Sequence, residues 1–220
     1  MGTLTDRADA LLRAPNKANP YERQRYFDLL YSHGDDPWRL RERWYERRKH
    51  ALTIAMLPRE RYRNVFEPGC ANGELSAMLA PRCDALLAAD LHERAVRAAR
   101  ERLAPWPGAR VERCAAPQEW PEAAAPFDLI IVSELAYYLA PDELQQLAVR
   151  IEGSLDGTGC LLACDWRHGF AGRHASAEAV HACFASRCGV VRVAHHVETD
   201  VLIDVWTRDG RSVAQLEQFA

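Results

Sequence analysis

"NVFEPGCANGELSAML", residues 64–79, reads as a short apolar strand, a turn with two glycines and the start of a helix. This order opens a nucleotide-binding unit in α/β domains. Gly69 and Gly73 allow the backbone conformations that a tight turn needs. The strand ends at Glu67, however, and a carboxylate at this place repels a phosphate. The stretch therefore predicts the fold and leaves open what the turn binds.

Strand and helix patterns alternate from residue 64 to about residue 185, and two strands end the pattern. Alternation predicts a parallel sheet with helices on both faces, and the terminal strand pair predicts an antiparallel strand at one edge. The predicted strands are residues 64–69, 85–90, 109–116, 127–135, 160–166, 190–198 and 201–208. The predicted helices between them are residues 74–82, 93–103, 142–155 and 176–187.

The chain before this unit predicts a helical lead-in. Residues 1–20 are polar, residues 21–33 have apolar side chains at helical spacing, and residues 39–57 form a second expected helix that Pro58 ends. We expect the second helix to bury an apolar side with Trp44, Ala51 and Ala55 and to expose its many arginines. The chain of 220 residues then forms one domain, with a lead-in over residues 1–58 and a core over residues 59–220.

Composition excludes several classes of protein. The formal net charge of −3 lacks the basic excess of a general nucleic-acid binder, and no apolar run approaches the ~20 residues of a membrane span. The seven cysteines are odd in number and include no CxxC pair. We expect reduced thiols in a cytoplasmic protein and no metal site; a zinc site is the alternative, without close ligand spacing to favour it.

The turn does not fit the common phosphate-binding motifs. G-x-G-x-x-G aligned on Gly69 meets Ala71 and Glu74 instead of glycine, and no lysine of a Walker A loop is present. The turn does fit acid-x-Gly-x-small-x-Gly, with Glu67, Gly69, Ala71 and Gly73. A carboxylate there favours a cation, and S-adenosylmethionine carries an ammonium and a sulfonium but no phosphate. The alternative is that Glu67 is a solvated strand end.

Asp90 ends the second predicted strand, 21 residues after Gly69. An acid at this distance can accept hydrogen bonds from both ribose hydroxyls, in NAD and S-adenosylmethionine proteins alike. Asp90 could also cap the following helix. After the third strand, where an acid often meets the adenine amino group, the sequence has Ala115 and Ala116, so backbone atoms or Gln118 would have to serve.

The segments EPGCANG, CDALLAAD, EWPEAAAPFDLIIVSELAYYL, CDWRH and LIDVWTR, in this order, resemble class I S-adenosylmethionine-dependent methyltransferases. DPW followed by YERRKHALTIAMLP is similar, more narrowly, to the group around nodulation protein S, the N-methyltransferase of rhizobial lipo-chitooligosaccharide synthesis. The resemblance covers roughly residues 36–208. It implies a Rossmann-like, doubly wound, mostly parallel seven-stranded sheet with an antiparallel last strand and an N-terminal helical lid.

The resemblance also implies a cofactor site. The lead-in of such families closes over the cofactor, and Arg48 could pair with the methionine carboxylate. The usual glycine at position 71 is replaced by alanine, which is small enough to keep the match. The expected cofactor-binding residues are Trp38, Tyr45, Arg48, Glu67, Gly69, Cys70, Ala71, Gly73, Asp90, Leu91, Ala115, Ala116, Ser133 and Glu134.

SELAYYL follows the fourth strand, next to where the methyl group would be transferred. Methyl transfer needs an aligned nucleophile and exclusion of water. Glu134 and His168 are the candidates to take a proton from an amine, and Tyr137 provides an aromatic wall. Glu134 could equally be a hydrogen-bond acceptor on the cofactor side, and His168 could be a surface loop residue.

The sequence thus predicts a methyltransferase that uses S-adenosylmethionine, releases S-adenosylhomocysteine and acts on a small-molecule acceptor, with an amine preferred by resemblance. Methylation of oxygen, sulfur or carbon stays open. An NAD(P)-dependent oxidoreductase and a non-catalytic S-adenosylmethionine-binding protein are the alternatives from other classes. The oligomeric state is not encoded in any readable pattern.

Overall fold

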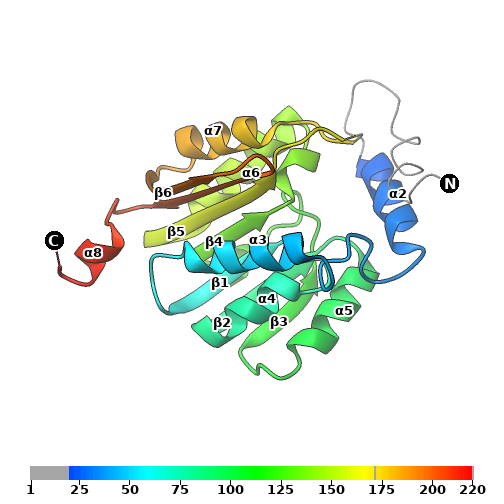
Figure 1. The fold of residues 1–220 in the computed structure, drawn as a ribbon, viewed down its shortest axis with the longest axis horizontal. Coiled ribbons are helices and arrows are strands. Elements are labelled where there is room, and N and C mark those ends of the chain that lie inside the picture. Colours follow the sequence, from blue (N-terminus) through cyan, green and yellow to red (C-terminus); the bar gives the residue numbers. More distant parts are fainter. Residues whose placement is uncertain (1–19, 171, 220) are drawn as a thin grey trace.

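The computed structural model describes residues 20–170 and 172–219, which form a seven-stranded sheet between two layers of helices (Figure 1). The first 19 residues of the expected lead-in lie outside the described residues. The strand order is β3-β2-β1-β4-β5-β7-β6. The strands are β1 (Tyr62–Pro68), β2 (Cys83–Asp90), β3 (Ala109–Arg113), β4 (Phe127–Ser133), β5 (Leu155–Trp166), β6 (Val191–Val197) and β7 (Val201–Thr207).

The sheet reverses its order between β1 and β4. Strands β1 to β5 pair in parallel, and β7 pairs antiparallel with both β5 and β6. The predicted Rossmann-like architecture with an antiparallel last strand is confirmed. Ligands of such sheets bind at the carboxyl ends of the strands beside the point of reversal. That point lies between Glu67 on β1 and Ser133 on β4.

Alternate side chains of each central strand enter two separate apolar cores. Phe66 and Ile130 pack on one face of the sheet, and Val65 and Leu129 pack on the other. The first face is covered by α6 (Pro141–Ser154) and α7 (Ala177–Arg187), and the second by α3 (Trp44–Ala55), α4 (Glu74–Leu79) and α5 (Glu93–Leu103) (Figure 1). Burial on both faces explains why β4 is apolar along nearly its whole length.

The lead-in contains α2 (Pro20–Tyr31) and α3, joined by turns. The expected orientation of α3 is wrong. Trp44 is 69% exposed, whereas the buried residues of this helix are all polar: Glu46, Lys49, His50 and Thr53. Helix α3 therefore buries a polar face beside Leu52 and Ile54, which pack partly buried against the second core, and its buried charges require partners inside the protein.

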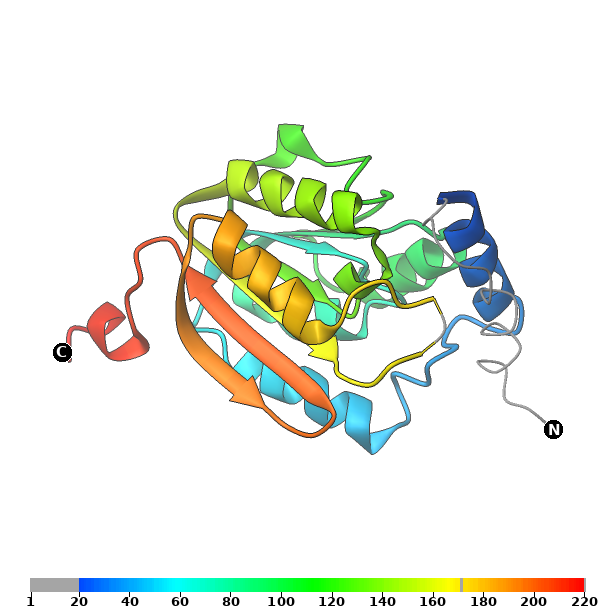
Figure 2. The same cartoon turned by 90° about the horizontal axis from the view of Figure 1, so that it is seen from above.

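Several element boundaries differ from the prediction. Helix α3 begins at Trp44 rather than at residue 39, and β5 begins at Leu155, the last residue of the expected helix, rather than at residue 160. A short helix that the sequence analysis did not predict, α8 (Val213–Leu216), follows β7. It stands away from the sheet, at the end opposite to α2 (Figure 2). None of these differences moves the carboxyl edge of the sheet, where the predicted site lies.

Candidate active site

A cavity of about 340 Å³ opens at the carboxyl edge of the sheet. Its walls come from α2, α3, the turn after β1, the ends of β2 and β4, and the loop after β5. Segments that are far apart in the sequence thus meet at one place. Twelve of the predicted site residues line the cavity: Trp38, Tyr45, Glu67, Gly69, Cys70, Ala71, Asp90, Leu91, Ala116, Ser133, Glu134 and Tyr137.

The turn after β1 is held against the end of β2. The amides of Gly69 and Cys70 donate to the carbonyl of Ala89 at 2.7 and 2.9 Å, and the amide of Ala71 donates to the Asp90 carboxylate at 3.0 Å. Gly69 has φ +76°, and a Cβ atom there would lie 3.2 Å from Leu135. Ala71 has φ +48°, a left-handed conformation that strains an L-residue. The turn therefore needs glycine at 69 and tolerates alanine at 71 with strain.

Glu67 is buried directly beneath this turn. Its carboxylate accepts a hydrogen bond of 2.5 Å from the Ser76 hydroxyl at the start of α4. Burial raises the pKa of Glu67 to about 7, and the charge of Asp90 adds to the rise, against the effect of the Ser76 hydrogen bond. Within residues 20–170 and 172–219, Glu67 makes no ion pair. It is a buried acid that lacks a counter-charge and is not the solvated strand end of the alternative interpretation.

Asp90, whose side chain is partly buried, also lacks a counter-charge. Burial raises its pKa to about 6, although the backbone amides of His92 and Ala71 donate to its carboxylate. Helix α5 begins at Glu93 and is capped by the His92 side chain, which accepts from the Arg94 amide at 3.2 Å. Asp90 is therefore not the cap of this helix, and its carboxylate faces the cavity with no ion pair among the described side chains.

A buried cluster of charges joins α3 to the end of β4. The Lys49 ammonium, 4% exposed, lies 2.8 Å from Glu134 and 2.7 Å from Glu46. Tyr137 donates its hydroxyl to Glu134, and the backbone amide of Trp166 donates to the same oxygen at 3.2 Å. Burial acts to lower the pKa of Lys49, but the two carboxylates outweigh it, so the pKa is raised and the ammonium stays charged.

Aromatic side chains from the lead-in form the opposite wall. Tyr26 and Phe27 pack against Tyr138, with ring centroids 6.0 and 5.2 Å apart. Tyr31 stacks on His92 at 4.4 Å and packs against Trp38 at 5.6 Å. These contacts connect α2 to the ends of β2 and β4, so the lead-in closes one side of the cavity.

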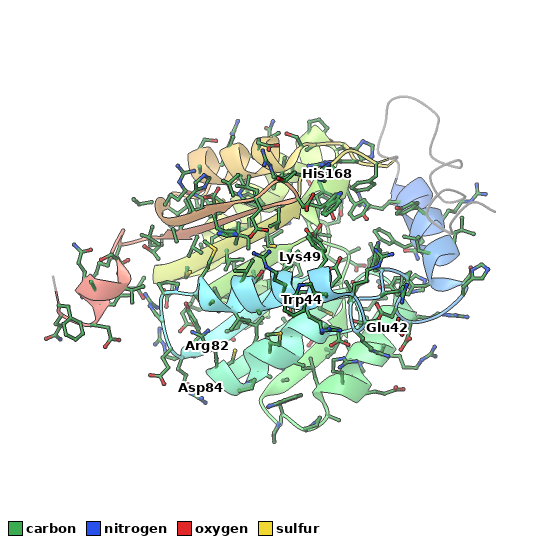
Figure 3. The ribbon with its side chains drawn as sticks, viewed as in Figure 1. Glu42, Trp44, Lys49, Arg82, Asp84 and His168 are labelled. Carbon is green, nitrogen blue, oxygen red and sulfur yellow. The ribbon has the colours of Figure 1, made fainter. Side chains whose placement is uncertain are left out.

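Four predicted site residues do not line the cavity. Arg48 makes a bidentate pair with Glu198, at 2.6 and 2.7 Å, on the turn between β6 and β7. His168 lies 2.6 Å from Asp200 and is half exposed, apart from Lys49 (Figure 3). Gly73 packs against Ala99 of α5, which leaves 3.1 Å for a Cβ atom. All three residues thus contact other parts of the protein and not the cavity.

Ala115 is the fourth. Its amide donates to the Glu119 carboxylate at 2.9 Å, and Gln118 donates to Glu143 at 2.6 Å. The backbone N–H and carbonyl of Ala115 are thus both bonded within the loop, and Gln118 is held against Glu143. Ala116 and Cys114 line the cavity in their place.

The sequence analysis missed Lys49, Glu46 and His50, which also line the cavity. Burial and the nearby Lys49 charge lower the pKa of His50 to about 4, so its imidazole is neutral at physiological pH. The signal was an acid–base pair three residues apart beside an arginine run, which is typical of a solvated helix face. The burial of Lys49 is explained by its ion pair with Glu134 at the end of β4, which the local sequence around α3 does not reveal.

Comparison with known proteins identifies the family. A family model described as nodulation protein S (NodS) matches residues 23–210. The chain belongs to the NodS family. Nodulation protein S of Bradyrhizobium diazoefficiens is 32% identical over 117 residues, which cover 53% of this chain and 55% of that protein. The chain thus aligns with about half the length of the curated NodS proteins it matches.

Solved structures share the fold. A candidate methyltransferase from Pseudomonas syringae is 52% identical, with a TM-score of 0.67 over 76% of this chain and 100% of that chain. The N-methyltransferase NodS from Bradyrhizobium japonicum WM9, solved with S-adenosylhomocysteine, is 24% identical, with a TM-score of 0.71 over 94% of this chain and 98% of that chain. The latter likeness concerns the fold alone.

Three further observations concern the described part of the chain. Among the side chains that the structure describes, no group of three or more His, Cys, Asp or Glu residues could hold a metal ion. In the described part of the chain no helix is long and apolar enough to cross a membrane. All seven cysteines are free thiols.

Proposed function

We propose that this protein transfers a methyl group from S-adenosylmethionine to an amine nitrogen of a small-molecule acceptor. The observation that carries the proposal is a pair of acids, the buried Glu67 and the partly buried Asp90, which flank the glycine turn without a cationic partner in the described chain. Both have a raised pKa, to about 7 and about 6. Such a pair favours a ligand that brings positive charge and hydroxyl donors.

S-adenosylmethionine fits this set of groups. Asp90 would accept hydrogen bonds from the two ribose hydroxyls, and Glu67, through the turn, would face the cationic methionine end. Arg43 lines the cavity and forms no ion pair with any described residue, so it is available for the α-carboxylate, the role expected of Arg48. The strained turn lets the ligand approach the backbone at Gly69 and Ala71.

The same groups disfavour NAD(P). Its pyrophosphate would lie at the turn above Glu67, where no lysine or arginine pairs with that carboxylate in the described structure. The acids that line the cavity outnumber its bases: Glu46, Glu67, Glu74, Asp90 and Glu134 against Arg23, Arg43 and Lys49. We therefore rank an oxidoreductase below a methyltransferase.

The bound cofactor would supply an electrophilic methyl group on a positively charged sulfur. The residues of this chain would bind and align. Tyr137, Trp166 and Phe170 would exclude water from one side of the reacting atoms, and the aromatic wall of α2 would do so from another. The amine lone pair forms the new N–C bond, the C–S pair stays on the sulfur, and the product ammonium later gives a proton to water.

An amine is favoured over oxygen, sulfur or carbon because the relative of known structure from Bradyrhizobium japonicum WM9 is an N-methyltransferase. An oxygen acceptor would need a base to remove its proton during attack. His168, one candidate, lies outside the cavity, and Glu134 is already held by three donors. The buried cluster at Glu134 also argues against a binding protein without turnover, which has no need of charges beside the methyl group.

We further propose one functional domain, with a lead-in over residues 1–58 and a core over residues 59–220, in the cytoplasm. Seven free thiols suit a reducing compartment. The absence of a basic excess in the sequence favours a small-molecule partner over nucleic acid.

Calorimetric titration with S-adenosylhomocysteine, and with NAD in parallel, tests the cofactor. We expect binding of the first in the micromolar range and none of the second. Methyl transfer from labelled S-adenosylmethionine to a panel of amines and matched alcohols then tests the acceptor atom. Binding of NAD alone would overturn the proposal.

A further inference from the structure

The backbone at Glu134 is strained. This residue has φ +56°, a left-handed conformation that costs free energy in any residue other than glycine. Its amide donates to the carbonyl of Cys164 on β5 at 2.8 Å, which holds the conformation. Strain of this kind persists where the surrounding structure imposes it, and it often occurs at functional sites. Here it turns the Glu134 side chain from the end of β4 toward α3.

The Glu134 carboxylate is nearly saturated with hydrogen-bond donors. One oxygen accepts from the Lys49 ammonium at 2.8 Å. The other accepts from the Tyr137 hydroxyl and from the amide of Trp166 at 3.2 Å. A carboxylate has about four acceptor positions, so one position is left, on the oxygen that faces Lys49. Glu134 lines the cavity, so a ligand bound there can approach its carboxylate.

Lys49 is held from two sides. Its ammonium also lies 2.7 Å from Glu46, one turn earlier on α3, and 5.4 Å from the centroid of the Tyr45 ring. The next residue in the chain, Arg48, ties the same helix to Glu198. Helix α3 is therefore fixed to β4 and to the β6–β7 turn by adjacent side chains. Lys49 cannot swing away from Glu134 without leaving two buried carboxylates unpaired.

We propose that Glu134 accepts an N–H of the acceptor amine through its one open position, and that Lys49 is a positioning residue that fixes Glu134 for this contact. The inference deepens the proposed function and rests on it. It resolves the two roles left open by the sequence in favour of a hydrogen-bond acceptor over a proton-removing base. A carboxylate with three fixed donors is suited to orienting a nucleophile. If Glu134 took a proton, its negative charge would be lost and the buried Lys49 ammonium would lose part of its electrostatic stabilisation.

The substrate class follows from this contact. The acceptor must carry at least one N–H while its lone pair points at the methyl group, so it is a primary or secondary amine that reacts in its neutral form. The nitrogen forms one new bond to carbon, and the extra proton leaves to water after the product is released. Acceptors that present a carboxylate or phosphate at this point would be repelled by Glu134.

Sinefungin offers a test without a known acceptor. It matches S-adenosylhomocysteine but carries an amine-bearing carbon where the methylated sulfur would be, so its N–H donors should reach Glu134. The measured quantity is the affinity for sinefungin divided by the affinity for S-adenosylhomocysteine, by calorimetry on the full chain. We expect Glu134→Gln to lower this ratio about tenfold or more, as a charge-assisted hydrogen bond is weakened.

Substitution of Lys49 is the more discriminating test, because two possible roles of this residue predict opposite changes in the ratio. If it only screens Glu134, Lys49→Met should raise the ratio, because a competing positive charge is removed. If it positions Glu134, Lys49→Met should lower the ratio about threefold or more, and Lys49→Arg should restore part of it. Arg48→Met, on the same helix but outside the cavity, is the control and should leave the ratio unchanged. If Lys49→Met does not fold, Tyr137→Phe replaces it as the test. This change removes one hydrogen-bond donor to Glu134 without unpairing a charge, and it should also lower the ratio.

The outcomes separate the two proposals. If folded wild-type protein binds neither ligand, both the proposed function and this inference are wrong. If it binds both ligands and Glu134→Gln leaves the ratio unchanged, the methyltransferase proposal stands and the role of Glu134 is wrong. A raised ratio in Lys49→Met would overturn the positioning role alone.

Discussion

The two sides of the cavity treat their buried acids in opposite ways. On the side of β1 and β2, Glu67 is buried and Asp90 is partly buried, neither pairs with a cation in the described structure, and their pKa values rise to about 7 and about 6. On the side of β4, Glu134 is matched by Lys49 and two further donors. The first side lacks a positive charge that a ligand could bring. On the second side the charge of Glu134 is already matched before any ligand binds.

This difference teaches how the site divides its work. An unpaired buried acid is costly, so the fold keeps it only where binding recovers the cost. A paired acid is stable and rigid, which suits a group that must orient a reactant. We therefore expect changes on the β4 side to affect stability first, and changes on the β1–β2 side to affect cofactor binding first.

The largest expected effect is on the β4 side. Lys49→Met should lower the free energy of unfolding by on the order of 3 kcal/mol, because Glu46 and Glu134 lose their shared cation inside the protein. Denaturant unfolding would measure it. Arg48→Met is the matched control: its ion pair with Glu198 is partly exposed, so its effect should be well below that of Lys49→Met. An equal fall in the free energy of unfolding in the two variants would show that the buried Lys49 pairs contribute no more to stability than the partly exposed Arg48–Glu198 pair.

On the β1–β2 side, Asp90→Ala should weaken S-adenosylhomocysteine roughly 10- to 100-fold, since hydrogen bonds to a charged group contribute about 1.5–3 kcal/mol. The thermal midpoint should fall less than in Lys49→Met, because no ion pair is broken, although the hydrogen bonds from the Ala71 and His92 amides are lost. Asp84→Ala is the control, on the same strand but at its other end, where Asp84 pairs with Arg61 (Figure 3). Normal binding by Asp90→Ala would place the ribose elsewhere.

The smallest expected effect concerns strain in the turn. Ala71→Gly should relieve the left-handed conformation, which costs about 1 kcal/mol in an L-residue, while the flexibility of glycine offsets part of that gain. We expect a net rise in the free energy of unfolding of about 0.5 kcal/mol, with cofactor affinity within twofold of wild type. A clear loss of stability would mean that the Ala71 methyl group makes contacts that outweigh the strain.

The fold and the β1–β2 side were predictable from the sequence, for a physical reason. Strand β4 is buried on both faces, so it reads as an uninterrupted apolar run, and the Glu67–Gly69–Asp90 pattern is local to two strand ends. The β4 side was not predictable in the same way. Lys49 and Glu134 are 85 residues apart, and only the packing of α3 brings them together.

The errors have the same origin. A helix with Trp44 and several arginines suggests an apolar face toward the core, yet α3 buries Lys49 because Glu134 lies at the end of β4, and Glu46 pairs with the same ammonium. His168 follows a strand at the carboxyl edge, but its loop turns it toward Asp200 and away from the cavity. The pattern of polarity along the chain indicates which charges suit a solvent-exposed face. It does not indicate whether an oppositely charged residue, distant in the sequence, is buried nearby in the fold.

The most direct test of the comparison is the proton balance of cofactor binding. Glu67 and Asp90 have raised pKa values, so each is partly protonated near pH 6.5 without ligand, and a cationic ligand favours the ionised forms. Titration with S-adenosylmethionine at pH 6.5, in buffers of different ionisation enthalpy, should therefore show net release of protons, with the release fading by pH 8.5. Affinity should rise between pH 5.5 and pH 8 for the same reason. Binding without proton release at pH 6.5 would contradict the account, because these acids would then already be ionised and would not be waiting for a cation.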